Sequence, residues 1–258
     1  MRHSWRVGDG LSAQERYFFD VHGYLVIDGV LPRDDALRLN EVISGRRLPR
    51  PGDSVGSQRF GADFLLWDQQ FRDLLDHPAV LPRLRDLVGD FLRLDHAYGI
   101  VMAPESAGLG LHGGGTPWDP SQYYVHEGGR MHNGLTTVTW SLVDAGAGHG
   151  GFGCIPGSHK AAEPLPGGVP GDWVKEIHLA AGSVLIFTEA LTHCTLPWKA
   201  PYERRAVLFK YAPGHLAWGR HEPPPAALWR TLTATQRRLF QPPAVAPHEP
   251  VLPAGEDR

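Results

Sequence analysis

The sequence predicts a mainly β domain preceded by a helical flank, and three observations support this prediction. From residue 91 onward the apolar residues form short or alternating runs, whereas before it they recur at helical spacing. Glycine, proline and aspartate separate the later runs, as turns separate short strands. The chain also carries 31 glycines and 23 prolines in 258 residues, which many turns explain better than long helices do. This pattern is typical of a β-barrel or a β-sandwich.

The helical flank begins with a predicted helix over residues 12–22. Ser12 and Glu15 have the spacing of a capping box, in which each side chain bonds the backbone N–H of the other residue. Gly23 suits the end of this helix because glycine adopts the left-handed conformation without a steric penalty. The apolar and β-branched run at 24–31 predicts a strand.

A second helix is expected over residues 32–45, which open with proline and acidic residues and end in glycine. Residues 46–61 show no periodicity and predict a loop. Two short helices are expected near residues 67–75 and 79–89.

The predicted strands of the β core follow one another with short connections. They are expected in the runs 91–104, 135–145, 151–159, 174–179, 183–196 and 204–214. A surface loop rich in proline and glycine is expected at 160–172, and a late helix at 224–240. The proline-rich tail beyond residue 241 is expected to be extended or disordered.

One domain over residues 1–258 is the simplest organisation of these elements. Residues 1–90 would form the helical flank with the first strand, 91–215 the β core, and 216–258 the C-terminal helix and tail. The sequence leaves the oligomeric state open.

Composition argues against several classes of partner and location. The net charge of −3 gives no general attraction to nucleic acid or to an anionic membrane. There is no apolar signal core at the N-terminus and no apolar run of about 18 residues, so a cytoplasmic protein is expected. Cys154 and Cys194 are the only cysteines and form no CxxC pair, which argues against a disulfide framework or a zinc cluster.

Three motifs follow one another on the predicted β core. They are "LHGGG" at 111–115, "CIPGSHK" at 154–160 and "LTHCTLPWKAPYERRAVLFKYAPG" at 191–214. Their order and spacing resemble the phytanoyl-CoA dioxygenase-like branch of the iron(II)/2-oxoglutarate oxygenases. The resemblance extends from "HGYLVIDGVL" at 22–31 to "YAPG" at 211–214. It implies a double-stranded β-helix, a cupin-like jelly roll with flanking helices.

The resemblance also implies an iron(II) site with 2-oxoglutarate and O₂ as co-substrates. His112 and His193 correspond to the two iron-binding histidines, since neutral imidazole is a suitable iron ligand. Arg204, eleven residues after His193, would pair with the distal carboxylate of 2-oxoglutarate. Thr195 lies on the same face as His193 and would offer that carboxylate a hydroxyl, whereas Arg205 would face the other way.

The family pattern places a carboxylate two residues after the first histidine, but position 114 is glycine. No His-x-Asp or His-x-Glu occurs anywhere in the chain. We first consider an oxygenase with an atypical two-histidine iron site, whose open position beside Gly114 holds water or a carboxylate from elsewhere. Asp119 and Glu127 are the nearest such carboxylates along the chain.

Two alternatives remain open. Iron(II)/2-oxoglutarate halogenases carry glycine or alanine in place of the carboxylate and bind halide there, so Gly114 is similar to their pattern and chloride becomes a candidate cofactor. The chain would otherwise be a non-catalytic β-barrel binding module. A histidine pair followed by an arginine argues against that module, because a lost site has no need for the arginine.

The expected substrate is a small or medium-sized metabolite, with candidate pocket residues Trp118, Tyr124 and Arg130. No cluster of lysine and arginine marks a site for a coenzyme A phosphate. A role in natural-product tailoring rests on the breadth of the family, which is an analogy. His159 and Trp140 are interpreted as structural, the first as a turn residue that bonds backbone and the second as core or pocket wall.

Overall fold

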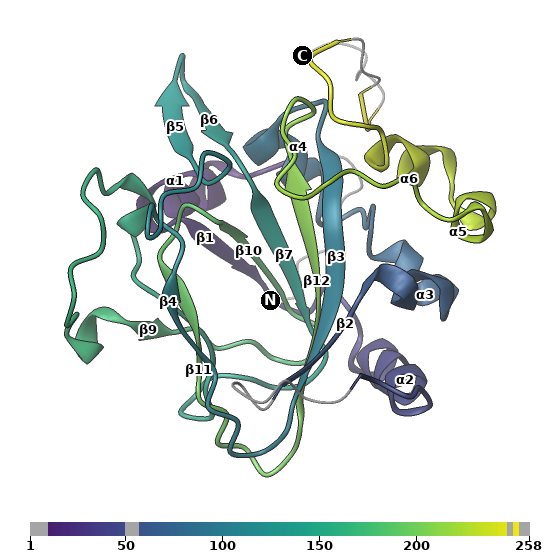
Figure 1. Ribbon diagram of the computed structural model, residues 1–258, viewed down its shortest axis with the longest axis horizontal. Coiled ribbons are helices and arrows are strands. Elements are labelled where there is room, and N and C mark those ends of the chain that lie inside the picture. Colours follow the sequence, from purple (N-terminus) through teal and green to yellow (C-terminus); the bar gives the residue numbers. More distant parts are fainter. Residues whose placement is uncertain (1–9, 50–56, 247–249, 253–258) are drawn as a thin grey trace.

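Two antiparallel sheets face each other and form the body of the protein in the computed structural model, which describes residues 10–49, 57–246 and 250–252 (Figure 1). The larger sheet has six strands in the order β1-β10-β7-β12-β3-β2, and the smaller has four in the order β4-β11-β8-β9. β5 and β6 form a separate hairpin. This arrangement confirms the predicted mainly β fold with the architecture of a double-stranded β-helix.

The strands have the following bounds: β1 Tyr24–Ile27, β2 Ser57–Phe60, β3 Arg93–Met102, β4 Leu109–His112, β5 Tyr124–Glu127, β6 Arg130–Asn133, β7 Thr136–Ser141, β8 Gly151–Cys154, β9 Lys175–Glu176, β10 Val184–Thr188, β11 His193–Leu196 and β12 Arg204–Ala212. The α-helices are α1 Ala13–His22, α2 Arg33–Ser44, α3 Gln69–Asp73, α4 Leu81–Val88, α5 Ala226–Thr231 and α6 Ala234–Leu239. Short 3₁₀ helices cover Ala62–Leu66, Ser158–Lys160 and Gly171–Trp173.

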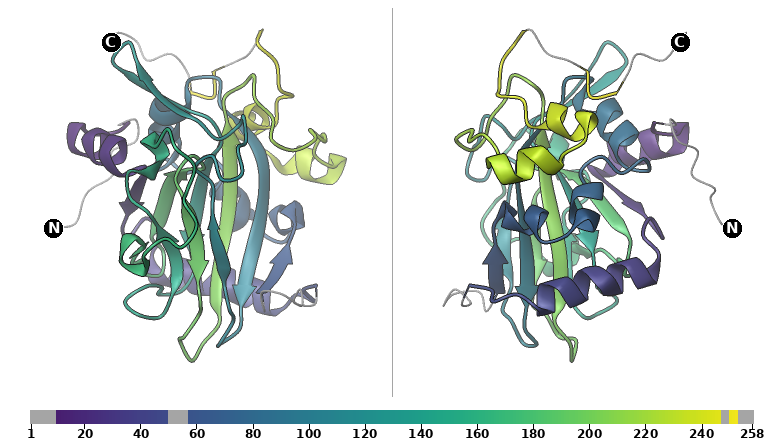
Figure 2. Two further views of the ribbon diagram at one scale, coloured as in Figure 1. Left: turned by 60° about the vertical axis from the view of Figure 1, so that its left-hand side comes forward. Right: turned by 90° about the vertical axis from the view of Figure 1, so that its right-hand side faces the viewer.

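The helices α2, α3, α5 and α6 cover the outer face of the larger sheet (Figure 2). Side chains of that face, such as Trp140 and Phe209, pack with helix residues in one buried apolar cluster. A second cluster, which includes Met102, Phe152 and Phe187, fills the space between the two sheets. The strands β1, β3, β10 and β12 of the larger sheet therefore contribute residues of one face to the first cluster and of the other face to the second, as the pleat requires.

This alternation is clearest at the start of β12. Arg204 is buried and belongs to the face that looks between the sheets, with Ala206 next on that face. Arg205 faces outward and donates hydrogen bonds to the Asn40 carbonyl (2.8 Å) and to Ser44 Oγ (2.7 Å) of α2. The predicted separation of the two arginines onto opposite faces is confirmed.

Helix boundaries that depend on local chemistry follow the sequence closely. Ser12 and Glu15 form the predicted capping box of α1, and Gly23 ends the helix with φ +79°. The predicted helices at 32–45, 67–75 and 79–89 are present as α2, α3 and α4. Every helix in the described part of the chain is too short or too polar to cross a lipid bilayer.

Four expectations need correction. The predicted loop 46–61 contains the edge strand β2, whose residues pair with β3; residues 50–56 of that loop lie outside the described ones. The run 183–196 is two strands, one in each sheet. The single late helix is two short helices. Within the tail, Val251 is buried and donates its N–H to the Asp90 carbonyl at 3.1 Å.

Candidate active site

Two histidines meet where the smaller sheet pairs β4 with β11. His112 is the last residue of β4 and His193 the first of β11, and the two are partners in the ladder. Their ring centroids lie 4.2 Å apart. The pairing register therefore brings together two side chains that are 81 residues apart in sequence.

In both histidines the ring nitrogen Nδ1 is bonded to a backbone carbonyl of the residue two positions earlier. His112 Nδ1 lies 2.9 Å from the Gly110 carbonyl, and His193 Nδ1 lies 2.7 Å from the Leu191 carbonyl. A carbonyl only accepts, so each Nδ1 carries the proton and each Nε2 keeps its lone pair. Histidines that bind metals are commonly oriented in this way by a backbone carbonyl.

His193 lies in an apolar wall of the space between the sheets. The Phe152 ring stacks on it at 5.7 Å with an interplanar angle of 21°, and the Phe187 ring packs at 4.8 Å. Burial disfavours the imidazolium and lowers the pKa of His193 to about 4, although Glu189 opposes the shift. The ring is therefore neutral near pH 7, as a metal ligand must be.

Arg204 is a buried cation with no carboxylate partner among the described residues. Its Nη1 contacts only a weak acceptor, Met102 Sδ, at 3.4 Å. A Cβ atom added to Gly151 would lie 3.4 Å from Arg204 Nε, so the guanidinium lies against the strand residue that precedes Phe152. Burial lowers the pKa of Arg204 to about 10.

Thr195 follows His193 by two residues on β11 and shares its face of the strand. In the ladder it pairs with Phe152 of β8, next to the Gly151 position that Arg204 contacts. The arginine, the hydroxyl and the histidine ring thus border one region between the sheets.

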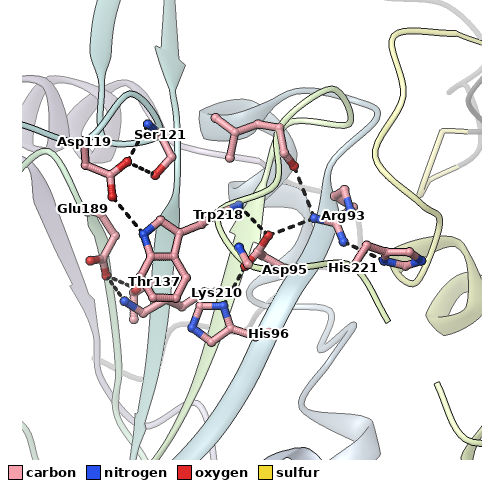
Figure 3. Close-up of polar contacts among 12 residues, drawn as sticks. Arg93, Asp95, His96, Asp119, Ser121, Thr137, Glu189, Lys210, Trp218 and His221 are labelled. Atoms are coloured by element: carbon pink, nitrogen blue, oxygen red, sulfur yellow. Dashed lines mark hydrogen bonds and ion pairs between the residues drawn. The ribbon is translucent and has the colours of Figure 1, made fainter. Parts of the chain in front are cut away.

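Sequence reasoning missed Glu189, which lies directly after β10 and is almost fully buried (2% exposed). Its Oε1 accepts hydrogen bonds from the Thr137 hydroxyl and from Lys210 Nζ, the latter at 2.9 Å (Figure 3). Its Oε2 lies 3.9 Å from His193 Nε2. The only sequence signal was a lone carboxylate inside the apolar run "SVLIFTEAL".

Glu189 is held as an anion despite its burial. Burial alone would raise its pKa, but the charge of Lys210, the charge of His193 once it is protonated at low pH, and the Thr137 hydrogen bond lower the pKa to about 2. A buried carboxylate that stays ionised beside the metal-binding candidate His193 adds negative charge where a cation would bind.

Gly114 does not border an empty space. It has φ +61°, and a Cβ atom added there would overlap Thr192 Oγ1 and lie 3.0 Å from the Ala190 carbonyl. Its N–H donates to the Glu189 carbonyl at 3.4 Å. The glycine loop after His112 therefore packs directly on the turn that joins β10 to β11.

A surface cleft of about 510 Å³ adjoins His112. Trp118, Asp119 and Trp218 are among its lining residues. Asp119 accepts hydrogen bonds from Ser121 N (2.8 Å) and from Trp218 Nε1 (2.8 Å), as Figure 3 shows. The cleft thus combines two indole rings with a carboxylate next to a candidate iron ligand.

Three other predicted residues lie away from this cleft lining. Glu127 and Arg130 are exposed partners in the β5–β6 hairpin. Tyr124 donates its hydroxyl hydrogen to Asp20, and its ring packs edge-on against His159 at 4.6 Å.

The structural roles expected for two residues are confirmed. Trp140 is fully buried in the core cluster beneath the helices. His159 Nε2 lies 3.1 Å from the Asp20 carbonyl, so it bonds backbone from within the "PGSHK" turn. The two cysteines are free thiols: Cys154 pairs with His193 in the β8–β11 ladder, and burial raises its pKa to about 12.

The side chains at this site are suitable ligands for iron, but they would have to move closer together to bind it. As the side chains stand, no three His, Cys, Asp or Glu residues in the described ranges are near enough together to hold a metal ion. Two histidines whose Nε2 atoms keep their lone pairs nevertheless lie side by side, an ionised carboxylate lies 3.9 Å from one of them, and Arg204 supplies an uncompensated positive charge on the face between the sheets. This is the chemistry that a ferrous ion with a dicarboxylate co-substrate requires.

The family model described as phytanoyl-CoA dioxygenase (PhyH) matches residues 19–206. The chain belongs to the phytanoyl-CoA dioxygenase family. No curated protein sequence matches the chain.

Solved structures of other proteins share the fold of this family member. HygX from Streptomyces hygroscopicus, bound to nickel and 2-oxoglutarate, matches with a TM-score of 0.72 at 25% identity, over 85% of this chain and 94% of HygX. HygX with nickel, 2-oxoglutarate and hygromycin B matches at 0.72 and 26% identity, over 84% and 94%. The epimerase SnoN from nogalamycin biosynthesis matches at 0.61 and 19% identity, over 78% and 83%, which shows the fold alone.

Proposed function

We propose that this protein is an iron(II)/2-oxoglutarate-dependent oxygenase-type enzyme that modifies a small or medium-sized metabolite in natural-product biosynthesis. One observation carries the proposal: Arg204 is a buried guanidinium with no carboxylate partner in the described structure, and it lies against Gly151 of β8, the strand that pairs with His193 of the histidine pair. A dicarboxylate co-substrate would neutralise that charge. The similarity to HygX, which was solved with 2-oxoglutarate, supports the same assignment.

Each residue then has a physical task. Nε2 of His112 and of His193 would bind the iron, and the carbonyls on the Nδ1 atoms would hold the rings in place. Arg204 would pair with the distal carboxylate of 2-oxoglutarate, with Thr195 beside it. Iron bound with the keto acid supplies the oxidising power by activating O₂. Phe152 and Phe187 exclude water from the His193 side of the site.

Spectroscopy and turnover test this assignment directly. Anaerobic addition of iron(II) and 2-oxoglutarate should give a visible charge-transfer band, and in air the protein should consume 2-oxoglutarate only when iron is present. His112→Ala and His193→Ala should abolish the band. If wild-type protein gives neither the band nor iron-dependent consumption, the binding-module interpretation replaces the proposal.

The cleft beside His112 indicates the kind of substrate. Indole faces such as Trp118 and Trp218 stack on flat apolar surfaces, while Asp119 attracts cationic or hydroxyl groups. HygX was solved with hygromycin B bound. We therefore assign to this chain a polar metabolite with amino or hydroxyl groups as its substrate class, recognised at the cleft rather than between the sheets.

The halogenase alternative places chloride on iron beside Gly114. Thr192 Oγ1 fills the space next to that glycine, which disfavours a halide site there. A structure with iron, 2-oxoglutarate and bromide tests the alternative by anomalous scattering. Bromide on the iron would favour the halogenase, and its absence at saturating bromide would favour the oxygenase-type chemistry.

A further inference from the structure

We propose that Glu189 is the carboxylate ligand of the iron and takes the place of the carboxylate that is missing two residues after His112. This inference rests on the proposed function and adds the identity of the third protein ligand. It concerns a residue that follows β10 in the larger sheet, whereas the usual position lies in the segment after β4 of the smaller sheet.

The geometry at His193 is the first support. Glu189 Oε2 lies 3.9 Å from His193 Nε2, the nitrogen that keeps its lone pair. Two ligands at roughly 2.1 Å from one metal ion lie about 3 Å apart when they subtend a right angle. A displacement of about 1 Å would bring Oε2 into position, which a change in the glutamate side-chain torsions supplies.

The second support is the way in which the carboxylate is held. Oε1 accepts hydrogen bonds from Thr137 and Lys210 (Figure 3). This leaves Oε2 on the side of His193, 3.9 Å from its Nε2. Carboxylate ligands are oriented by hydrogen bonds to the oxygen that does not bind the metal. Thr137 and Lys210 are therefore positioning residues, and they come from two neighbouring strands, β7 and β12.

The third support explains the glycines after His112. The Glu189 carbonyl accepts the N–H of Gly114 and lies 2.8 Å from the place where a Cβ of Gly113 would be. The loop that lacks a carboxylate thus packs on the turn that carries one. Side chains at these two glycines would push that turn away from His112, so the glycines and Glu189 form one arrangement.

The alternative ligands named from the sequence have other partners. Asp119 is bonded to Ser121 and to Trp218 Nε1. Glu127 is exposed in the β5–β6 hairpin. Neither carboxylate contacts a histidine of the pair in the described structure, whereas Glu189 is within 4 Å of one.

Metal affinity, measured without turnover, separates these candidates. Nickel(II) binding to the whole protein with saturating 2-oxoglutarate would be followed by calorimetry for wild type, Glu189→Gln, Asp119→Asn and Glu127→Gln. We expect Glu189→Gln to raise the nickel Kd at least tenfold, because the ligand loses its charge, and the other two to stay within twofold of wild type. Circular dichroism of each metal-free variant verifies folding.

The wild-type protein provides a second measurement in case Glu189→Gln does not fold. A crystal structure with nickel and 2-oxoglutarate should place Glu189 Oε2 about 2.1 Å from the metal. A metal bound by the histidines with Oε2 beyond about 3 Å, or an unchanged Kd in folded Glu189→Gln, would overturn the inference and leave the proposed function intact. Failure of wild type to bind nickel and 2-oxoglutarate at all would overturn both.

Discussion

At the scale of single residues, the most unusual feature of the site is the positive charge of Arg204, which the fold buries without a neutralising partner among the described residues. Arg204 is fully enclosed, and its pKa falls because the protein around it solvates the guanidinium poorly. Such a group destabilises the empty protein and strengthens the binding of an anion that reaches it. Under the proposed function, the stability of the free protein and the affinity for 2-oxoglutarate would therefore be opposed at this position.

Replacement of Arg204 by methionine should separate these two effects. We expect the Kd for 2-oxoglutarate, measured by calorimetry with nickel(II), to rise on the order of 100-fold, equivalent to about 3 kcal/mol. The unfolding midpoint of the metal-free protein should stay the same or rise, because an uncompensated buried charge is removed. Arg205→Met is the matched control, since Arg205 faces α2, and its Kd should not change. Equal losses of affinity in both variants would contradict the prediction.

Gly114 allows a second test at this scale. Gly114→Ala should lower the free energy of unfolding by about 2 kcal/mol more than Gly115→Ala, as measured by urea denaturation. Both glycines have positive φ, but only at Gly114 would a Cβ meet Thr192; at Gly115 nothing lies within 4 Å. Adding Thr192→Ala should restore part of the loss at Gly114. An equal loss of unfolding free energy in the two variants would mean that backbone strain, and not the contact with Thr192, accounts for the effect.

At the scale of elements, the turn from β10 to β11 carries the chain from one sheet to the other. It begins with Glu189 and ends before His193, so a carboxylate and a histidine face the same space from different sheets. The turn also donates the Thr192 N–H to Ser158 Oγ at 2.8 Å, which connects it to the "PGSHK" segment. That segment is anchored on α1 through His159 and the Asp20 carbonyl.

This anchor makes the stability of the protein depend on pH. Burial lowers the pKa of His159 to about 4, below its ordinary value of 6.5, so the unfolded chain takes up the proton first as the pH falls. The stabilisation is complete above pH 6.5 and is lost between pH 6.5 and 4. Wild type should therefore lose about 2 kcal/mol more than His159→Gln between pH 7 and 4.5 in urea titrations. Parallel losses in both proteins would show that other groups account for the pH dependence.

Elements with local signals could be predicted from the sequence, and those that depend on distant partners could not. The capping box of Ser12 and Glu15 requires only neighbouring residues, and α1 appeared as expected. β2 has no periodicity of its own and exists because β3 offers it an edge. The end of strand β10 before Glu189 could not be predicted, because the apolar run continues through Ala190 and Leu191.

The same distinction explains the site. His112 and His193 were named because the family motif contains them, and the register of β4 and β11 places them side by side. Glu189 was missed because its neighbours, Lys210 and Thr137, come from strands whose pairing the sequence does not state. Asp119 was named only by its distance along the chain, and such a distance gives no information on a side chain that approaches from across a sheet.

At the scale of the whole molecule, a buried ion pair fastens the C-terminal segment to the larger sheet. Arg93 Nη1 lies 3.0 Å from Asp95 Oδ1, both residues belong to β3, and both side chains are almost inaccessible to solvent. Arg93 also donates to the carbonyls of Leu216 and Gln241, and Asp95 accepts the Trp218 N–H. This fastening places the Trp218 indole at the cleft, stacked on His96 of β3 and bonded to Asp119 (Figure 3).

Loss of the Asp95 charge should therefore be costly. Asp95→Asn leaves Arg93 as an unpaired buried cation and should lower the free energy of unfolding by about 3–5 kcal/mol. Amide hydrogens around residue 218 should exchange faster than in wild type. Arg33→Ala is the control: its ion pair with Asp144 is exposed on both sides, and its removal should cost less than about 1 kcal/mol. A change below 1 kcal/mol in Asp95→Asn would contradict the argument.

The environment of Cys154 bears on how long such an enzyme works before it damages itself. An active site that activates O₂ releases oxidants next to its own side chains, and a thiolate is among the first groups to react with them. Cys154 pairs with His193 in the sheet, yet it is fully buried and its thiol stays protonated far above neutral pH. The cysteine that pairs with His193 in the ladder is thus kept in its slow-reacting form, which would favour many turnovers per molecule before inactivation.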